Sequence, residues 1–146
     1  LVLSTVHTND SVAAITRMID IGIESYLLAS TLKAVLAQRL VRKLCTSCKE
    51  SFSLDSNIGT LKKGINVFKP KGCDSCSNTG YQGRVGIFEL FLITDEIKEA
   101  INDGETENRL SDLAFSNENK LSHSGYDLVF RGVTSLEEIL RVTSEK

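Results

Sequence analysis

The chain has 146 residues, of which 41% are hydrophobic and 25% charged, as in ordinary globular domains. Its 17 lysines and arginines nearly balance 19 aspartates and glutamates, and a formal net charge of -2 argues against nucleic acid as a main partner. The single proline and 10 glycines exclude a collagen-like or proline-rich chain, and no apolar stretch of the sequence approaches the length of a membrane span.

The start of the sequence has neither the basic region nor the cleavage site of a signal peptide, and it does not begin with methionine. We therefore expect the chain to begin inside a larger protein. Its four cysteines form two Cys-x-x-Cys pairs, which in a reducing compartment bind metal more often than they form disulfides. These features predict a cytoplasmic location.

Residues 1–6 are rich in leucine and β-branched side chains, which predicts a buried parallel strand that leads into a polar loop. A helix is expected next, because Asn9 or Asp10 can cap it and Gly22 can end it. Residues 25–42 carry apolar side chains at helical spacing and predict a second, largely buried helix.

The composition changes at residues 45–83, which contain all four cysteines and show little helical periodicity. This segment predicts a small inserted module rich in loops. An apolar strand is expected over residues 84–93, followed by a short helix that starts at Thr94 and ends near Gly104.

The remaining residues are predicted to be helical. Two weaker helices are expected between residues 105 and 131, with a break near residues 117–120. Ser135 and Glu138 have the spacing of a capping box and predict the start of a last helix.

The strongest local signal is the pair of motifs Cys45-x-x-Cys48 and Cys73-x-x-Cys76. Each motif places two thiolates on one tight turn, and two such turns complete the tetrahedral ligand set that zinc prefers. Two redox-active pairs or four unrelated thiols are the alternatives, but neither explains why all cysteines fall into one loop-rich segment. We therefore predict a zinc site, structural because four sulfurs leave no open coordination position.

The sequence does not contain a complete nucleotide-binding motif. Residues 59–64 have the glycine interval of a phosphate loop, but Ile65 and Asn66 stand where lysine and a hydroxyl residue must follow. Arg84 lies among glycines that supply turns, and by itself it reads as a turn arginine.

Two histidines have little context of their own. His7 follows the predicted strand and precedes a helix, where open α/β sheets place ligand-binding groups, but a loop histidine with local hydrogen bonds is the plainer reading. His123 is expected at the surface.

Five segments taken together resemble the secretion ATPases of the GspE/PilB family, which drive type II secretion and type IV pilus assembly. The resemblance follows the chain in order over nearly its whole length. The segments are residues 3–10, 14–18, 36–45, 80–90 and 132–143.

This resemblance implies an α/β fold: the C-terminal portion of a RecA-like P-loop ATPase core with an inserted tetracysteine zinc module and a helical C-terminal tail. It divides the chain into three parts. Residues 1–44 would belong to the ATPase core, residues 45–83 to the zinc module, and residues 84–146 to a returning strand and the helical region.

The family hydrolyses ATP between neighbouring subunits of a hexameric ring. The resemblance implies that His7 is a catalytic residue near the terminal phosphate, where it would sense the nucleotide or support the transition state. It places Arg84 beside the adenine, where a guanidinium can stack on the ring. By the same resemblance Arg17 and Arg39 match motif arginines of undetermined role.

The family's phosphate loop and acidic motifs lie upstream of the region that Leu1 matches. ATP and magnesium binding is therefore expected of the parent protein, and the isolated chain is expected to be inactive. The resemblance further implies self-association in a ring and contacts with inner-membrane secretion or pilus platform proteins. Because retraction ATPases of the family lack the tetracysteine module, the cysteines favour an assembly or secretion motor.

A competing hypothesis is a zinc-stabilised docking module without a catalytic role of its own, which binds an inner-membrane partner or a neighbouring subunit. An independent zinc-ribbon that binds nucleic acid is a third hypothesis. It is the weakest, because it requires a basic, aromatic face that the composition does not favour.

Overall fold

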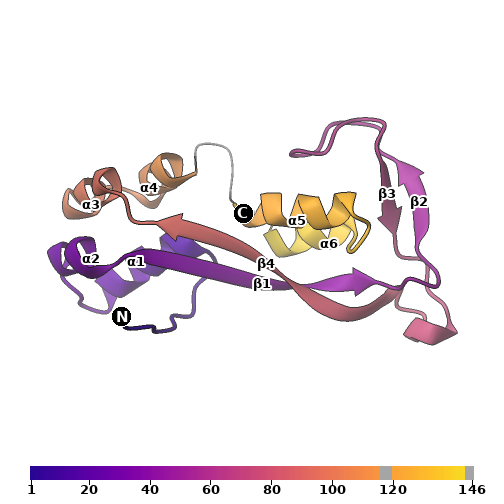
Figure 1. The fold of residues 1–146 in the computed structure, drawn as a ribbon, viewed down its shortest axis with the longest axis horizontal. Coiled ribbons are helices and arrows are strands. Elements are labelled where there is room, and N and C mark those ends of the chain that lie inside the picture. Colours follow the sequence, from indigo (N-terminus) through magenta and orange to yellow (C-terminus); the bar gives the residue numbers. More distant parts are fainter. Residues whose placement is uncertain (116–119, 144–146) are drawn as a thin grey trace. The chain divides into compact units, whose positions relative to one another are not determined.

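The computed structural model describes residues 1–115 and 120–143, which form a mixed arrangement of helices and small sheets. Strand β1 pairs with β4 and β2 pairs with β3, and the arrows of β1 and β4 run in opposite directions (Figure 1). The elements in chain order are α1 (Ser11–Asp20), α2 (Ser25–Thr31), β1 (Ala34–Leu44), β2 (Glu50–Ser53), β3 (Asn66–Lys69), the 3-10 helix η1 (Asp74–Cys76), β4 (Tyr81–Leu92), α3 (Asp95–Asn102), α4 (Glu107–Ala114), α5 (Leu121–Phe130) and α6 (Leu136–Thr143).

The chain divides into two compact units. The first comprises residues 1–37 and 88–120, and the second comprises residues 38–87 and 121–146, so that β1 and β4 each contribute residues to both. Each unit has its own cluster of buried apolar side chains. These units are groupings in space, whereas the predicted boundaries after residues 44 and 83 rest on composition and resemblance and stay a prediction.

The first unit contains α1 to α4, and its helix termini follow the predicted signals. Asp10 caps α1, since its Oδ1 accepts the N–H of Ala13 at 2.8 Å. Thr94 caps α3 in the same way, and Gly104 follows that helix with φ +71, a conformation that favours glycine. The buried core that these helices share consists of Val12, Ile15, Leu28, Ala29, Phe91, Ile93, Ile97, Ala100, Ile101, Leu110 and Phe115.

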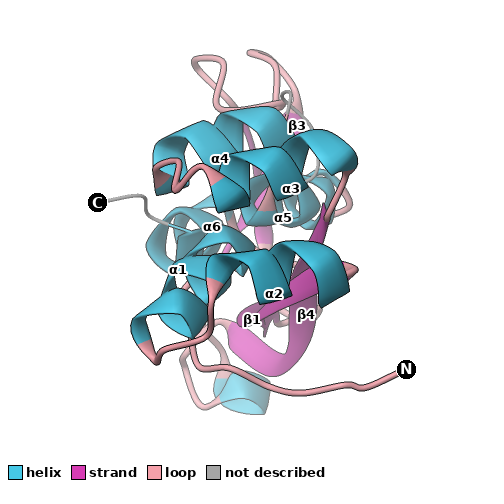
Figure 2. Cartoon of the chain, turned by 90° about the vertical axis from the view of Figure 1, so that its left-hand side faces the viewer, coloured by secondary structure: helices cyan, strands magenta, loops and turns pink. Residues whose placement is uncertain are grey.

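The predicted strand over residues 1–6 is wrong. This segment forms no strand, its first three side chains are at least 87% exposed, and Figure 2 draws it as a loop. A strand requires a neighbour for its backbone N–H and C=O groups, and the two sheets among the described residues pair other segments. Apolar composition alone did not supply such a partner.

The predicted helix over residues 25–42 is also wrong in its second half. Helix α2 ends at Thr31, and β1 begins at Ala34, where exposure starts to alternate from one residue to the next. The carbonyl oxygen of Lys33 accepts the N–H of Ile93 at 3.1 Å, just beyond the β4 strand. A long apolar run fits the spacing of a helix as well as that of a strand. Here the residues form a strand because they pair with β4.

Strand β4 confirms the predicted strand over residues 84–93 with a slightly earlier start. Helices α4 and α5 confirm the two helices expected between residues 105 and 131. Residues 117–119 of the predicted break lie outside the described residues.

The second unit combines the β2–β3 pair with α5 and α6. Strands β2 and β3 are antiparallel, with Glu50 opposite Lys69. Helix α5 approaches α6 closely at Gly125, where an added Cβ would lie 2.7 Å from a side-chain carbon of Ile139. The buried core of this unit consists of Val41, Leu54, Leu61, Val67, Ile87, Leu121, Leu128, Val129 and Ile139.

An ion-pair network around one buried carboxylate joins β1 to α6 in this unit. Glu138 is 1% exposed, and its carboxylate accepts the backbone N–H of Arg42 at 3.0 Å and Nη2 of Arg42 and of Arg141 at 2.7 Å each. Burial raises the pKa of Glu138, but the donors of Arg141 and Arg42 outweigh it and lower that pKa to about 2. The Arg42 guanidinium also lies 4.0 Å from the ring centre of Tyr81.

The predicted capping box at the start of α6 is confirmed in one of its two halves. The Ser135 hydroxyl accepts the N–H of Glu138 at 3.2 Å. The Glu138 carboxylate accepts its hydrogen bonds from Arg42 and Arg141 and does not complete the second half of the box.

Candidate metal centre

The first cysteine pair lies on a tight turn directly after β1. The carbonyl oxygen of Cys45 accepts the N–H of Cys48 at 3.4 Å and that of Lys49 at 3.1 Å. The N–H of Cys45 donates to the carbonyl oxygen of Gly80 at 2.9 Å, just before β4 begins. The end of β1 and the start of β4 are therefore joined at the cysteine turn.

The second pair lies on η1 and the turn that follows it. The carbonyl oxygen of Cys73 accepts the N–H of Cys76 at 3.1 Å and that of Asn78 at 2.9 Å. Gly72 has φ +103, and a Cβ there would lie 2.7 Å from the carbonyl oxygen of Asn78. Glycine is thus required where the chain enters this turn.

The four sulfur atoms lie together, all within 4.8 Å of one another. The Sγ separations are 3.9 Å between Cys45 and Cys73, 3.8 Å between Cys48 and Cys76, and 3.8 Å between Cys73 and Cys76. A tetrahedral zinc ion with Zn–S bonds of about 2.3 Å places its sulfurs about 3.8 Å apart. The four thiols are free and are spaced as zinc ligands would be.

Backbone N–H groups prepare one of the thiols to be a thiolate. Cys76 Sγ accepts the N–H of Cys73 at 3.3 Å and the N–H of Gly80 at 3.2 Å. Burial raises the pKa of Cys76, but these donors outweigh it and lower the pKa to about 6. Burial raises the pKa of Cys48 to about 11, and its thiol neighbours add to that increase. A metal cation would supply the charge that lets all four thiols ionise together.

Side chains around the cluster tie it to the rest of the second unit. Lys49 donates from Nζ to the carbonyl oxygen of Gly132 at 2.8 Å and lies 4.4 Å from the ring centre of Phe68. Lys71 forms an ion pair with Glu50 at 2.7 Å. The loops that hold the cysteines are therefore attached to β2, β3 and the turn between α5 and α6.

The ligand set consists of sulfur alone. Within the part of the chain that the structure describes, the only group of three or more close metal-binding side chains is this one, and it contains no histidine or carboxylate. Four sulfurs at these distances suit zinc, and they leave no position for a substrate or a reactive water. The geometry suits a structural ion.

The structure does not bring the two predicted nucleotide-side residues into one described site. His7 is exposed on the N-terminal segment of the first unit, and Arg84 is exposed on the part of β4 that belongs to the second unit. Their predicted roles, catalytic for His7 and adenine-binding for Arg84, stay predictions.

Sequence reasoning missed a buried acid next to the predicted histidine loop. Glu89 lies on the buried side of β4 between Ile87 and Phe91 and is 5% exposed. Its Oε1 accepts the N–H of Ser11, the first residue of α1, at 3.1 Å. The sequence does contain a signal for this residue, because Glu89 is an acid at a position that the alternation of the strand places on the buried face.

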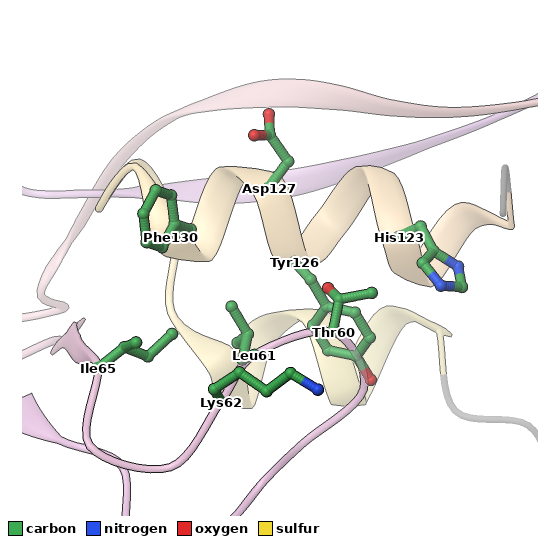
Figure 3. Close-up of a pocket in the computed structure, with 8 residues that line it drawn as sticks. All are labelled: Thr60, Leu61, Lys62, Ile65, His123, Tyr126, Asp127 and Phe130. Carbon is green, nitrogen blue, oxygen red and sulfur yellow. The ribbon is translucent and has the colours of Figure 1, made fainter. Parts of the chain in front are cut away.

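A hollow of about 350 Å³ lies in the second unit between the loop around Lys62 and helix α5 (Figure 3). Tyr126 points from α5 toward this loop, whereas Asp127 points away and pairs with Arg131 at 2.9 Å. His123, expected at the surface, is half-buried, and its Nδ1 is buried without a hydrogen-bond partner among the described residues. The lining residues include both a lysine and an aspartate, so their charges do not indicate which kind of ligand the hollow could bind.

No helix within residues 1–115 and 120–143 combines the length and the apolar character needed to cross a membrane.

Comparison with known proteins gives a consistent result. The sequence model of a family described as "Type II/IV secretion system protein" matches residues 1–141. Over essentially the whole chain, the sequence is 42% identical to type II secretion system protein E of Dickeya dadantii and 45% identical to that of Aeromonas hydrophila. It is 42% identical to type II secretion system ATPase E of Vibrio cholerae. The chain spans about 30% of the length of each of these relatives.

Proposed function

Because the chain belongs to the type II/IV secretion system protein family, we propose that it forms the C-terminal part of a motor ATPase that powers type II protein secretion. The Vibrio cholerae relative is named as a secretion ATPase, which supports this proposal. Type IV pilus assembly is the related alternative, because the motif segments of this chain also resemble the pilus assembly ATPases. ATP hydrolysis then belongs to the longer protein, with this chain as one part of it.

Within this motor, the contribution of this chain that has the most direct support is a structural zinc site. This assignment rests on the cluster of four free thiols, whose sulfur atoms all lie within 4.8 Å of one another, with three of the separations at 3.8 to 3.9 Å. The loops around it contain few buried apolar side chains, so that a bound ion would replace a hydrophobic core there. In this proposal Cys45, Cys48, Cys73 and Cys76 are the ligands.

For nucleotide binding, we propose that His7 lies near the terminal phosphate and Arg84 lies beside the adenine. Magnesium and ATP would be bound mainly by the rest of the longer protein. Both side chains are exposed, and so both can be reached by a ligand or by a neighbouring subunit. An imidazole can donate a hydrogen bond to a phosphate oxygen, and a guanidinium can stack on a base. A hexameric ring, attached to the cytoplasmic side of the inner membrane through platform proteins, completes this proposal.

A docking module is the second candidate function, and one observation favours it. Leu36, Phe88, Leu90 and Leu92, on the parts of β1 and β4 that belong to the first unit, are between 47% and 62% exposed. Exposed apolar side chains on neighbouring strands are typical of surfaces that another polypeptide covers. The two functions are compatible if the covered surface lies within the longer motor.

The test of the proposed function has two parts. Elemental analysis of protein purified without added metal is expected to give about one zinc per chain, and a Cys45→Ser/Cys48→Ser variant is expected to lose it. In a secreting bacterium, the same double variant of the complete protein is expected to abolish export of a type II substrate. A metal-free, fully folded wild-type chain would refute the zinc site, and normal export by a His7→Ala variant would refute the role of that histidine.

A further inference from the structure

Glu89 is an acid at a buried strand position that apolar side chains usually occupy. Along the second half of β4, Ile87, Glu89 and Phe91 are at most 5% exposed, while Phe88, Leu90 and Leu92 between and after them are exposed. Burying a carboxylate in such a row is costly unless it is fully hydrogen-bonded, and an apolar residue would fill the same space without that cost. A specific partner therefore has to explain the acid.

That partner is the first turn of α1. Glu89 Oε1 accepts both the backbone N–H and the hydroxyl hydrogen of Ser11, a residue with no exposed surface that lies 78 positions away in the sequence. The N–H groups in the first turn of a helix lack intrahelical partners and carry partial positive charge. The carboxylate satisfies one such group and ties the start of α1 to β4.

The segment between His7 and this anchor is short and internally bonded. The Thr8 hydroxyl donates to the carbonyl oxygen of Asp10 at 3.0 Å, and the Asp10 carboxylate accepts the N–H of Ala13 at 2.8 Å. Only three residues separate His7 from Ser11. A contact that fixes Ser11 to β4 therefore restricts where the His7 backbone can lie.

We infer that Glu89 is a positioning residue that holds the first turn of α1 on β4 and thereby fixes the loop that presents His7. This inference rests on the proposed role of His7. It assigns to Glu89 no contact with ATP: the carboxylate acts through Ser11 on the loop. Ser11, Glu89 and the His7 loop all belong to the first unit, so the inference depends on contacts within that unit alone.

The test begins with the zinc-loaded 146-residue chain. Glu89→Gln keeps the size of the side chain and an acceptor oxygen but removes the charge, and Ser11→Ala removes the hydroxyl partner. We expect both variants to shift the imidazole proton resonances of His7 and to speed amide hydrogen exchange at Ala13 by about tenfold. Glu99→Gln, a change of an exposed glutamate on α3, is the matched control and is expected to leave both signals unchanged.

The second readout is steady-state ATP turnover by the complete protein at a temperature where every variant is folded. Because a misplaced catalytic loop affects the transition state more than ground-state binding, Glu89→Gln is expected to lower kcat by about 10- to 100-fold with little change in KM. A double variant with His7→Ala is expected to be no slower than His7→Ala alone, because both act through one loop.

The outcomes separate this inference from the proposed function. Full turnover by His7→Ala would refute the role of His7 and with it the inference. A defective His7→Ala beside a normal Glu89→Gln would overturn the inference alone, and so would multiplicative losses in the double variant. An unchanged His7 spectrum in both Glu89→Gln and Ser11→Ala would overturn it without any measurement of activity.

Discussion

Glu138 offers the sharpest test of how the second unit is held together. The fall of its pKa from 4.5 to about 2 corresponds to roughly 3 kcal/mol of stabilisation of the charged form. The side chains of Arg42 and Arg141 are 47% and 59% exposed, so that solvent screens part of this interaction. We expect Glu138→Gln to lower the free energy of unfolding by roughly 2 kcal/mol at pH 7.

The sign of the pH dependence follows from the lowered pKa. The charged carboxylate contributes its full stabilisation above the unfolded pKa near 4.5, and this contribution is lost as the pH falls toward the folded pKa of about 2. The difference between wild type and Glu138→Gln should therefore shrink steadily below pH 4.5. Urea unfolding at several pH values, followed by tyrosine fluorescence, measures this difference. Loss of any bound zinc in acid would affect both proteins and would cancel in the comparison.

Glu137→Gln is the matched control, because Glu137 is the exposed neighbour on the same helix. It is expected to change the free energy of unfolding by less than about 0.5 kcal/mol at any pH. A difference between wild type and Glu138→Gln that stays constant from pH 7 to pH 3 would refute the reasoning. An equal effect of Glu137→Gln would refute it as well, since the loss would then not depend on the buried carboxylate.

Three further changes test separate parts of the molecule. A strong chelator, or Cys45→Ser, is expected to unfold the loops of the second unit, observed as a lower thermal midpoint, and an unchanged midpoint would argue against a structural ion. Gly125→Val is expected to cost about 1 to 3 kcal/mol in urea unfolding, because its side chain would collide with the fully buried Ile139. Asp10→Ala is expected to cost about 1 kcal/mol through loss of the α1 cap, and Asp10→Asn should restore most of it. The isolated, zinc-loaded chain is expected to show no ATP turnover, and sustained hydrolysis would contradict the assignment of phosphate binding to the rest of the longer protein.

The helix starts were predictable because their causes are local. Asp10, Thr94 and Ser135 each accept an N–H from a residue three positions later, so the signal and its partner lie within one turn of sequence. The strand β1 was not predictable in this way. Residues 34–42 satisfy helical and strand spacing at once, and the choice depends on β4, which lies almost 40 positions further along the chain.

In the candidate site, too, the local features were predictable and the contacts between distant residues were not. The two Cys-x-x-Cys pairs were visible because each pair is a local turn, and their approach to one another was predicted from the ligand set that zinc prefers. Glu89 and Glu138 were not visible as anchors, because their partners Ser11 and Arg42 lie 78 and 96 positions away. A single sequence shows only that an acid stands among apolar neighbours, and the structure is needed to supply the partner that explains it.

The cysteine cluster has a consequence beyond the loops that it closes. It lies where β1 ends and β4 begins, and the Cys45 N–H donates to Gly80 while Gly80 donates to Cys76. Because successive side chains of a strand point to opposite faces, a slip of one residue between β1 and β4 would reverse which side chains are buried. Such a slip would expose Ile87 and Glu89 on β4. An ion that held the ends of both strands in register would therefore also protect the alternation from Ile87 to Leu92 that leaves Glu89 buried.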